Sequence, residues 1–154
     1  MVTRLLIRPA AVDDSSSLEG LFDVLGYRAS TEAIAERVDR LCADASYESW
    51  VAIADGLVVG FAAGHLVHPI ECDRPAAQLI ALVTLPGNQG SGTGTVLCHE
   101  FEKWAWDCGA SRLVVTSGEH RVEAHGFYER RGYARTGIRF GKRLDETDAL
   151  TDLS

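Results

Sequence analysis

The chain has 154 residues, of which 46% are hydrophobic and 24% are charged, and its formal net charge is −7. This composition suffices for one globular core, so we expect a single domain over residues 1–154, with its core at about 3–144 and a polar tail at 145–154. The acidic balance disfavours nucleic acid as a partner and mildly favours a cationic substrate. No window approaches the roughly 18 uninterrupted apolar residues of a membrane span, and the N-terminus lacks the apolar core of a signal peptide. We therefore expect a cytoplasmic protein without a membrane contact.

The four cysteines are Cys42, Cys72, Cys98 and Cys108. They form no CxxC pair and no Cys/His spacing typical of a metal site, so we expect reduced, mostly structural thiols and no bound metal. Cys98 lies inside a predicted helix without a clear basic partner. A buried thiol is therefore favoured there over a covalent nucleophile.

The N-terminal third predicts one strand and two amphipathic helices. Residues 3–10 are typical of a strand that stops at Pro9. The first helix begins at Asp13 or Asp14, either of which can cap it, and ends at Gly26. Its apolar stripe consists of Leu18, Leu21, Phe22 and Leu25. The second helix follows Ser30 or Thr31 and has one apolar face, formed by Ile34, Val38 and Leu41.

The middle of the chain predicts a hairpin followed by a central strand. Two β-rich runs within residues 49–67 are separated by Asp55-Gly56, a sequence that favours the positive φ angles of a type I′ turn. Residues 76–86 form a nearly unbroken apolar run, which indicates a strand covered on both faces. The polar segment between them, residues 68–75, is expected to be a loop.

The last part of the chain predicts alternating helices and strands. A helix at about 91–108 has one apolar face, formed by Leu97, Phe101, Trp104 and Cys108, and it places Trp106 on the opposite face. A strand at 110–117 follows, and this order implies a parallel crossover. A helix at about 121–131 leads to residues 133–144, which we expect to close the sheet, although Gly137 and Gly141 weaken that strand.

The glycine-rich segment "LPGNQGSGTGT", residues 85–95, lies between the central strand and the following helix. A glycine-rich backbone with accessible N–H groups at a helix N-terminus is typical of an anion site. A nucleoside-triphosphate loop is disfavoured because no lysine follows Gly94. A dinucleotide fingerprint is disfavoured because the glycines come after the fourth predicted strand. A flexible turn that only caps the helix is the structural alternative.

Two motifs in the same order carry a family resemblance. The segment from Gln89 to Gly94 matches Q/R-x-x-G-x-G/A, and residues 125–133, "HGFYERRGY", resemble A-x-x-FYxxxGF with Ala124 in register. Together they make the chain resemble the GNAT superfamily of N-acetyltransferases over about residues 3–144. The resemblance implies an α/β fold: a mixed, mostly antiparallel central sheet with splayed parallel central strands and helices on both faces.

The resemblance also implies a site for acetyl-CoA as the cosubstrate. Its pyrophosphate is expected on the loop residues Gln89, Gly90, Ser91, Gly92, Thr93, Gly94 and Thr95. Its pantetheine arm is expected along the main chain of Leu82, Val83 and Thr84. Many relatives have an asparagine where this chain has Arg121. Arg121 and the neighbouring His120 are candidate contacts for a CoA phosphate, with a capping role alone as the alternative, and we include Arg121 among the CoA contacts. An N–H of Leu82 or Val83 is the expected donor to the oxyanion.

By the same resemblance, Tyr128 hydrogen-bonds or protonates the leaving CoA sulfur. Tyr128 as a core aromatic is the structural alternative. Many relatives carry a catalytic glutamate on the central strand, where this chain has Gln78, and glutamine cannot accept a proton. The candidates for the base are Glu71, His65, His68, Asp73 and an ordered water. Of these, Glu71 is assigned to the catalytic site together with Tyr128.

The expected reaction transfers acetyl from acetyl-CoA to a primary amine, by direct attack in a ternary complex. The acceptor is expected to be a small molecule, aminoglycoside-like among the possibilities, with Asp23, Glu71 and Asp73 as partners for its ammonium group. A protein or peptide amine is the second choice. A non-catalytic acyl-CoA sensor is a further alternative, which Gln78 and Arg121 favour and which the intact loop and Tyr128 oppose. A homodimer is possible, with Trp106 at its contact.

Overall fold

A computed structural model describes residues 4–117, 119 and 121–145 of the chain. These residues divide into two compact units, residues 1–114 and 115–154, which we describe separately. None of the helices in the described ranges is long and apolar enough to cross a membrane. Residues 146–154 of the predicted polar tail at 145–154 lie outside the described residues, as does His120.

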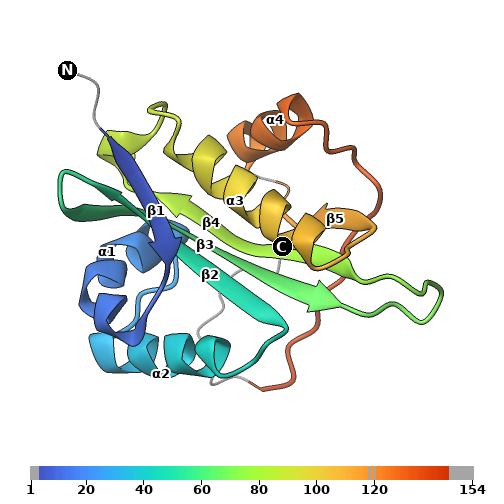
Figure 1. Ribbon diagram of the computed structural model, residues 1–154, viewed down its shortest axis with the longest axis horizontal. Helices are drawn as coiled ribbons and strands as arrows, with labels where there is room; N and C mark the ends of the chain where they lie inside the picture. Colours follow the sequence, from blue (N-terminus) through green and yellow to red (C-terminus); the bar gives the residue numbers. More distant parts are fainter. Residues whose placement is uncertain (1–3, 118, 120, 146–154) are drawn as a thin grey trace. The chain divides into compact units, whose positions relative to one another are not determined.

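A twisted sheet forms the centre of the fold (Figure 1). In the described residues it has five strands in the order β1-β2-β3-β4-β5. They are β1 (Leu5–Pro9), β2 (Tyr47–Ala54), β3 (Leu57–Val67), β4 (Ala76–Thr84) and β5 (Arg112–Val115). The first four strands pair antiparallel, and β5 runs parallel to β4. This mixed sheet confirms the expected fold class.

The hairpin between β2 and β3 forms as the sequence predicts. Its turn residues Asp55 and Gly56 have φ angles of 51° and 79°. Positive φ at both central positions is the requirement of a type I′ turn, whose twist matches that of the flanking strands.

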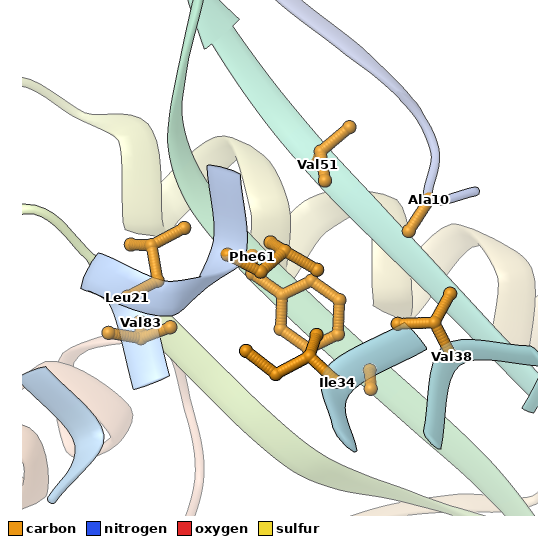
Figure 2. Close-up of a cluster of buried hydrophobic side chains, with 9 residues drawn as sticks. Ala10, Leu21, Ile34, Val38, Val51, Phe61 and Val83 are labelled. Carbon is orange, nitrogen blue, oxygen red and sulfur yellow. The ribbon is translucent and has the colours of Figure 1, made fainter. Parts of the chain in front are cut away.

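Helices α1 (Ser15–Leu25) and α2 (Thr31–Cys42) cover one face of the sheet (Figure 1). Figure 2 shows the buried cluster between these layers, in which side chains from both helices meet Val51, Phe61 and Val83 of three neighbouring strands. The helical members Leu18, Leu21, Ile34 and Val38 are at most 1% exposed. These four belong to the two apolar stripes that the sequence predicts, so amphipathic periodicity located this part of the core.

The ends of these helices follow the sequence at two positions and differ at a third. Gly26 ends α1 with a φ of 91°, and Ser30 caps α2 by accepting a hydrogen bond from the N–H of Ala33. Asp14 precedes α1 but makes no capping bond to it, so the predicted side-chain cap is wrong. Its carboxylate instead accepts bonds from Arg8 and from the N–H of Ala11, because the short 3-10 helix Val12–Asp14 turns it toward β1.

Helix α3 (Thr93–Asp107) packs on the opposite face of the sheet (Figure 1). Its contact depends on two strand glycines, Gly60 and Gly64, where an added Cβ would lie 2.8–2.9 Å from α3 side chains. Trp104 of α3 meets Trp50 of β2 edge to face, with 5.7 Å between ring centroids. Trp106 is 80% exposed, in agreement with its predicted position on the outer face of the helix.

The second unit contains α4 (Val122–Arg130), the predicted last helix. The expected strand at 133–144 is wrong, because these residues are irregular. Gly137 and Gly141 weaken a strand, and the apolar side chains that a ladder would cover are exposed: Ile138 is 79%, Phe140 90% and Leu144 96% exposed. Within this unit, alternating apolar residues were not sufficient to form a strand.

Candidate active site

The glycine-rich segment connects β4 to α3 in the first unit (Figure 1). Leu85 anchors its start, because the Leu85 N–H donates to the Val59 carbonyl at 2.9 Å. A short 3-10 helix, Pro86–Asn88, follows. Gly90 and Gly92 then have φ angles of 80° and 87°. L-residues with a side chain rarely adopt this conformation, so glycine is needed at both positions for the turn into α3.

Two hydroxyl side chains hold the turn together from within. The hydroxyls of Ser91 and Thr93 lie 2.8 Å apart, and the Ser91 hydroxyl also donates to the Asn88 carbonyl. Thr93 is only 1% exposed, and its methyl group packs at Gly60. The Thr93 side chain therefore supports the turn from the side of the sheet.

The turn ends at the N-terminus of α3. The first helical hydrogen bond runs from the Val96 N–H to the Gly92 carbonyl at 3.0 Å. Helix geometry leaves the N–H groups of Thr93, Gly94 and Thr95 without an acceptor inside the helix. These groups and the positive end of the helix dipole favour an anion such as a phosphate at this point.

The C-terminal half of β4 extends beyond β5. The two strands start level with each other, because the Ser111 N–H donates to the Pro75 carbonyl at 2.9 Å. Since β5 has four residues and β4 has nine, β5 ends beside the middle of β4. Among the strands that the structure describes, none lies beside residues 82–84 on this side. A backbone edge is thus available at the residues expected to pair with the pantetheine arm.

A bulge marks the same region of β4. Ala63 pairs with Ala81 and Gly64 with Leu79, so Ile80 has no partner in β3. Such an extra residue bends a strand and increases its local twist. The bulge separates the C-terminal part of β4 from Gln78, where the family resemblance predicts a glutamate.

Gln78 belongs to a row of side chains across three strands. His65 of β3 lies opposite Gln78 on one side and opposite Tyr47 of β2 on the other. The His65 and Tyr47 rings stack at 4.1 Å with 12° between their planes. His65 is one of several candidate bases in the sequence, but only the pairing register places it beside Gln78.

Two of the three carboxylates expected at the acceptor side, Glu71 and Asp23, form exposed ion pairs. A Glu71 oxygen lies 3.4 Å from the Arg112 guanidinium, and an Asp23 oxygen lies 3.1 Å from Nε of Arg28. Asp73 and His68 are exposed residues of the loop between β3 and β4. All four loop and helix candidates are therefore exposed at the surface.

Tyr128 and Arg121 belong to the second unit. Tyr128 lies on α4, where its ring makes edge contacts with Phe127 at 5.3 Å and with Tyr133 at 5.8 Å. It is half-buried rather than part of a fully buried core. Arg121 is the exposed residue just before α4, and its side chain makes no capping bond to the helix.

Cys98 is fully buried in α3, as the sequence predicts. The other three thiols are exposed and unbridged. Burial raises the pKa of the Cys108 thiol, and the nearby Asp107 and Glu48 carboxylates raise it further. In the described part of the chain, no group of three or more His, Cys, Asp or Glu residues is arranged to hold a metal ion.

The segment that carries the motif of an acetyl-CoA site thus forms a turn between β4 and the N-terminus of α3. The sequence pattern of the acetyltransferase (GNAT) family matches residues 18–133. The chain belongs to this family. It is therefore an acyltransferase of the GNAT type, as the resemblance of the two motifs indicated.

Three relatives illustrate the similarity of this GNAT protein to known proteins. An aminoalkylphosphonate N-acetyltransferase of Salmonella typhimurium is 27% identical over 143 residues, which are 90% of each chain. A putative acetyltransferase from Agrobacterium tumefaciens has a TM-score of 0.81 at 24% identity, over 90% of this chain and 99% of the other. The aminoglycoside N-acetyltransferase AAC(6')-Iy, solved in complex with CoA, has a TM-score of 0.81 at 19% identity, over 92% and 95%. The two structural similarities establish the shared fold.

Proposed function

We propose that this protein transfers an acetyl group from acetyl-CoA to the primary amine of a small molecule. The observation that carries the proposal is the continuity of the open β4 edge with the glycine turn and the N-terminus of α3. An extended arm with a phosphate at its end fits such an arrangement, because strand edges pair with extended chains and helix N-termini bind anions.

In this proposal the main chain does most of the donor binding. The N–H groups of the turn and of the first helical residues hold the pyrophosphate. The residues of this phosphate site are Gln89, Gly90, Ser91, Gly92, Thr93, Gly94 and Thr95. Leu82, Val83 and Thr84 pair with the pantetheine arm, and an N–H of Leu82 or Val83 polarises the thioester carbonyl. Arg121 contributes a further contact to CoA, and the Thr93 side chain supports the turn.

The leaving group is assigned to Tyr128. With ordinary pKa values of about 10 for a tyrosine and 8.5 for a thiol, complete proton transfer to the thiolate is uphill by roughly 2 kcal/mol. We therefore assign Tyr128 a hydrogen bond to the developing thiolate. The amine attacks acetyl-CoA directly in a ternary complex. The single domain, the cytoplasmic location and the homodimer expected from the sequence stay predictions.

The relatives suggest two acceptor classes. The Salmonella relative, which aligns over 90% of each chain, acts by its name on aminoalkylphosphonates. This coverage makes short aminoalkylphosphonates our second, more specific candidate. An aminoglycoside-like amine is supported by the fold similarity to AAC(6')-Iy. Both classes present a primary amine on a small molecule.

The proposal is tested in two steps with the full chain. Acetyl-CoA should raise the melting temperature, because a ligand that binds only the native state stabilises it. CoA release is then followed with a thiol reagent on a panel of aminoalkylphosphonates, aminoglycosides, polyamines and peptides. We expect turnover with at least one small amine. Turnover with peptides alone would favour the protein acceptor, whereas acetyl-CoA binding without any turnover would favour the sensor.

A further inference from the structure

We infer that His65 is the group that removes the proton from the acceptor amine. This inference rests on the proposed function and supplies the base that the sequence leaves open. The primary sequence offers Gln78 at the expected glutamate position, and glutamine cannot accept a proton. The sheet register places an imidazole directly beside it on the next strand.

The pairing register determines the face on which these side chains lie. Directly opposed residues of antiparallel strands point to the same face, with Cβ atoms about 4.5–5.5 Å apart. His65 shares its face with Phe61 and Ala63, which belong to the cluster under α1 and α2. Gly60 and Gly64 point instead toward α3. His65 and Gln78 therefore share the face covered by α1 and α2.

The position of the row along β4 fits a role at the reacting end of the donor. Gln78 lies two residues before the bulge at Ile80, and the proposed pantetheine contacts begin two residues after it. An arm that runs from the glycine turn back along residues 84–82 directs its thioester toward the bulge. The His65–Gln78 row is then the next pair of side chains that an attacking amine meets.

His65 is also held in place by an aromatic stack. Its ring is half-buried and stacks on Tyr47. Asp44, in the turn before β2, accepts bonds from Oγ and N–H of Ser46 at 2.7 and 2.9 Å. These bonds, and to a lesser degree the charge of His65, hold the pKa of the Asp44 carboxyl below its ordinary value. Asp44 is thus the carboxylate that interacts electrostatically with His65. Across the row, Tyr47 is the titratable partner on β2 and Gln78 is the neutral partner on β4.

Glu71, the base assigned from the sequence, is less well placed. Its side chain is 62% exposed, and one carboxylate oxygen forms an ion pair with the Arg112 guanidinium at the surface. A proton acceptor needs to be directed at the amine and to be available to it. The stack on Tyr47 fixes the orientation of the His65 ring, and its partial exposure leaves it accessible.

The proton balance of the step is simple. An ordinary alkylammonium with a pKa of about 10.4 is neutral in only about one molecule in 10³ near pH 7.4. His65 takes one proton from this ammonium, and the nitrogen lone pair forms the C–N bond to the thioester carbonyl. The C–S bond breaks, the thiolate takes the second amine proton, and the imidazolium returns its proton to water. The products are the amide, CoA as the thiol and one released proton.

The experiment compares substitutions at His65 with a control substitution of an exposed histidine. His65→Gln and His65→Phe should each lower kcat/KM by about 10²–10⁴-fold and remove the acid limb of its pH profile, with acetyl-CoA affinity unchanged. His65→Phe keeps an aromatic ring on Tyr47, so its loss of activity separates proton transfer from packing. The matched control is His99→Gln at an exposed position of α3, which should keep the wild-type rate and profile.

A compensating substitution provides a second test. Gln78→Glu in the His65→Gln background restores a proton acceptor to the same row and should recover kcat/KM at least about tenfold. The inference is overturned if His65→Phe retains the wild-type rate and pH profile. Failure of the proposed function is a separate outcome, since the wild-type protein would then release no CoA with any amine of the panel.

Discussion

Gly64 and Phe101 are in contact across the layer between β3 and α3. A Cβ built on Gly64 would lie 2.8 Å from the Phe101 ring and equally close to the ring of Trp104. Both rings belong to the helix that begins at the proposed phosphate site. The absence of a side chain at Gly64 thus sets how closely α3 approaches the sheet.

Replacement of Gly64 should therefore separate these layers. We expect Gly64→Ala to destabilise the fold by about 1–3 kcal/mol, because aromatic rings in a packed layer must move to admit the methyl group. Gly20→Ala on α1 is the control, since an added Cβ there would lie at an ordinary contact distance of 3.9 Å from the Leu85 side chain. It should stabilise the protein by about 0.5–1 kcal/mol. Urea unfolding of both variants checks the opposite signs, and a neutral Gly64→Ala would contradict the packing.

The ion pair of Arg8 and Asp14 should make the stability of the fold depend on pH in the acidic range. Two hydrogen bonds of 2.9 and 2.7 Å join them, and the Arg8 hydrogen bonds lower the pKa of the Asp14 carboxyl from its ordinary 3.8. A carboxyl with a lowered folded-state pKa stabilises the protein above its unfolded-state pKa. The contribution disappears as pH falls through the folded-state pKa.

Asp14→Asn should accordingly cost about 1–3 kcal/mol near neutral pH. The difference between wild type and variant should shrink as the pH falls below the ordinary carboxyl value, and urea unfolding at several pH values measures it. An equal difference at neutral and strongly acidic pH would show that packing, rather than charge, explains the loss.

Gly92 should be required for acetyl-CoA binding, and not only for the backbone conformation of the turn. Gly92 and Gly109 lie beside opposite ends of α3, both with positive φ and with no atom within 4 Å of an added Cβ. Their replacement by alanine should strain the chain similarly. We expect only Gly92→Ala to weaken acetyl-CoA binding, by about tenfold or 1.4 kcal/mol, in titration calorimetry. Equal losses in both variants would count against a phosphate site at this turn.

Tyr128→Phe should slow turnover without weakening the binding of CoA. If the hydroxyl stabilises the departing thiolate, kcat should fall by about 10²-fold while the Kd for CoA stays the same. Tyr133→Phe is a suitable control, because Tyr133 contacts the Tyr128 ring edge to face at 5.8 Å. Equal effects of the two substitutions would indicate that the aromatic contacts, and not the Tyr128 hydroxyl, determine the rate.

Cys98 should not carry the acetyl group. Its thiol is fully buried in α3, where no acceptor amine can approach it. Cys98→Ala should therefore retain acetyl transfer, and mass spectrometry of wild-type protein incubated with acetyl-CoA should show no acetylated Cys98. Parallel lines in a two-substrate kinetic analysis, typical of a ping-pong mechanism, would contradict direct attack.

The sequence by itself determined the features whose physical causes are local. Amphipathic periodicity placed Leu18, Leu21, Ile34 and Val38 in the core, and Asp55-Gly56 fixed the hairpin because few residue pairs accept two positive φ angles. The order of the two motifs identified the family, because each motif consists of residues close together in the sequence. Local reasoning was wrong where a side chain had a competing partner, as for Asp14, or where a strand needed a neighbour, as for residues 133–144.

Only the tertiary structure decided the features that depend on strand register. Residues 65 and 78 are separated by a loop whose length does not determine their pairing, and a shift of one residue would turn His65 to the other face. The bulge at Ile80 and the early end of β5 likewise arise from pairing between distant segments. The donor motif could thus be identified from consecutive residues, whereas the proposed base was located by the hydrogen-bonding register of the sheet.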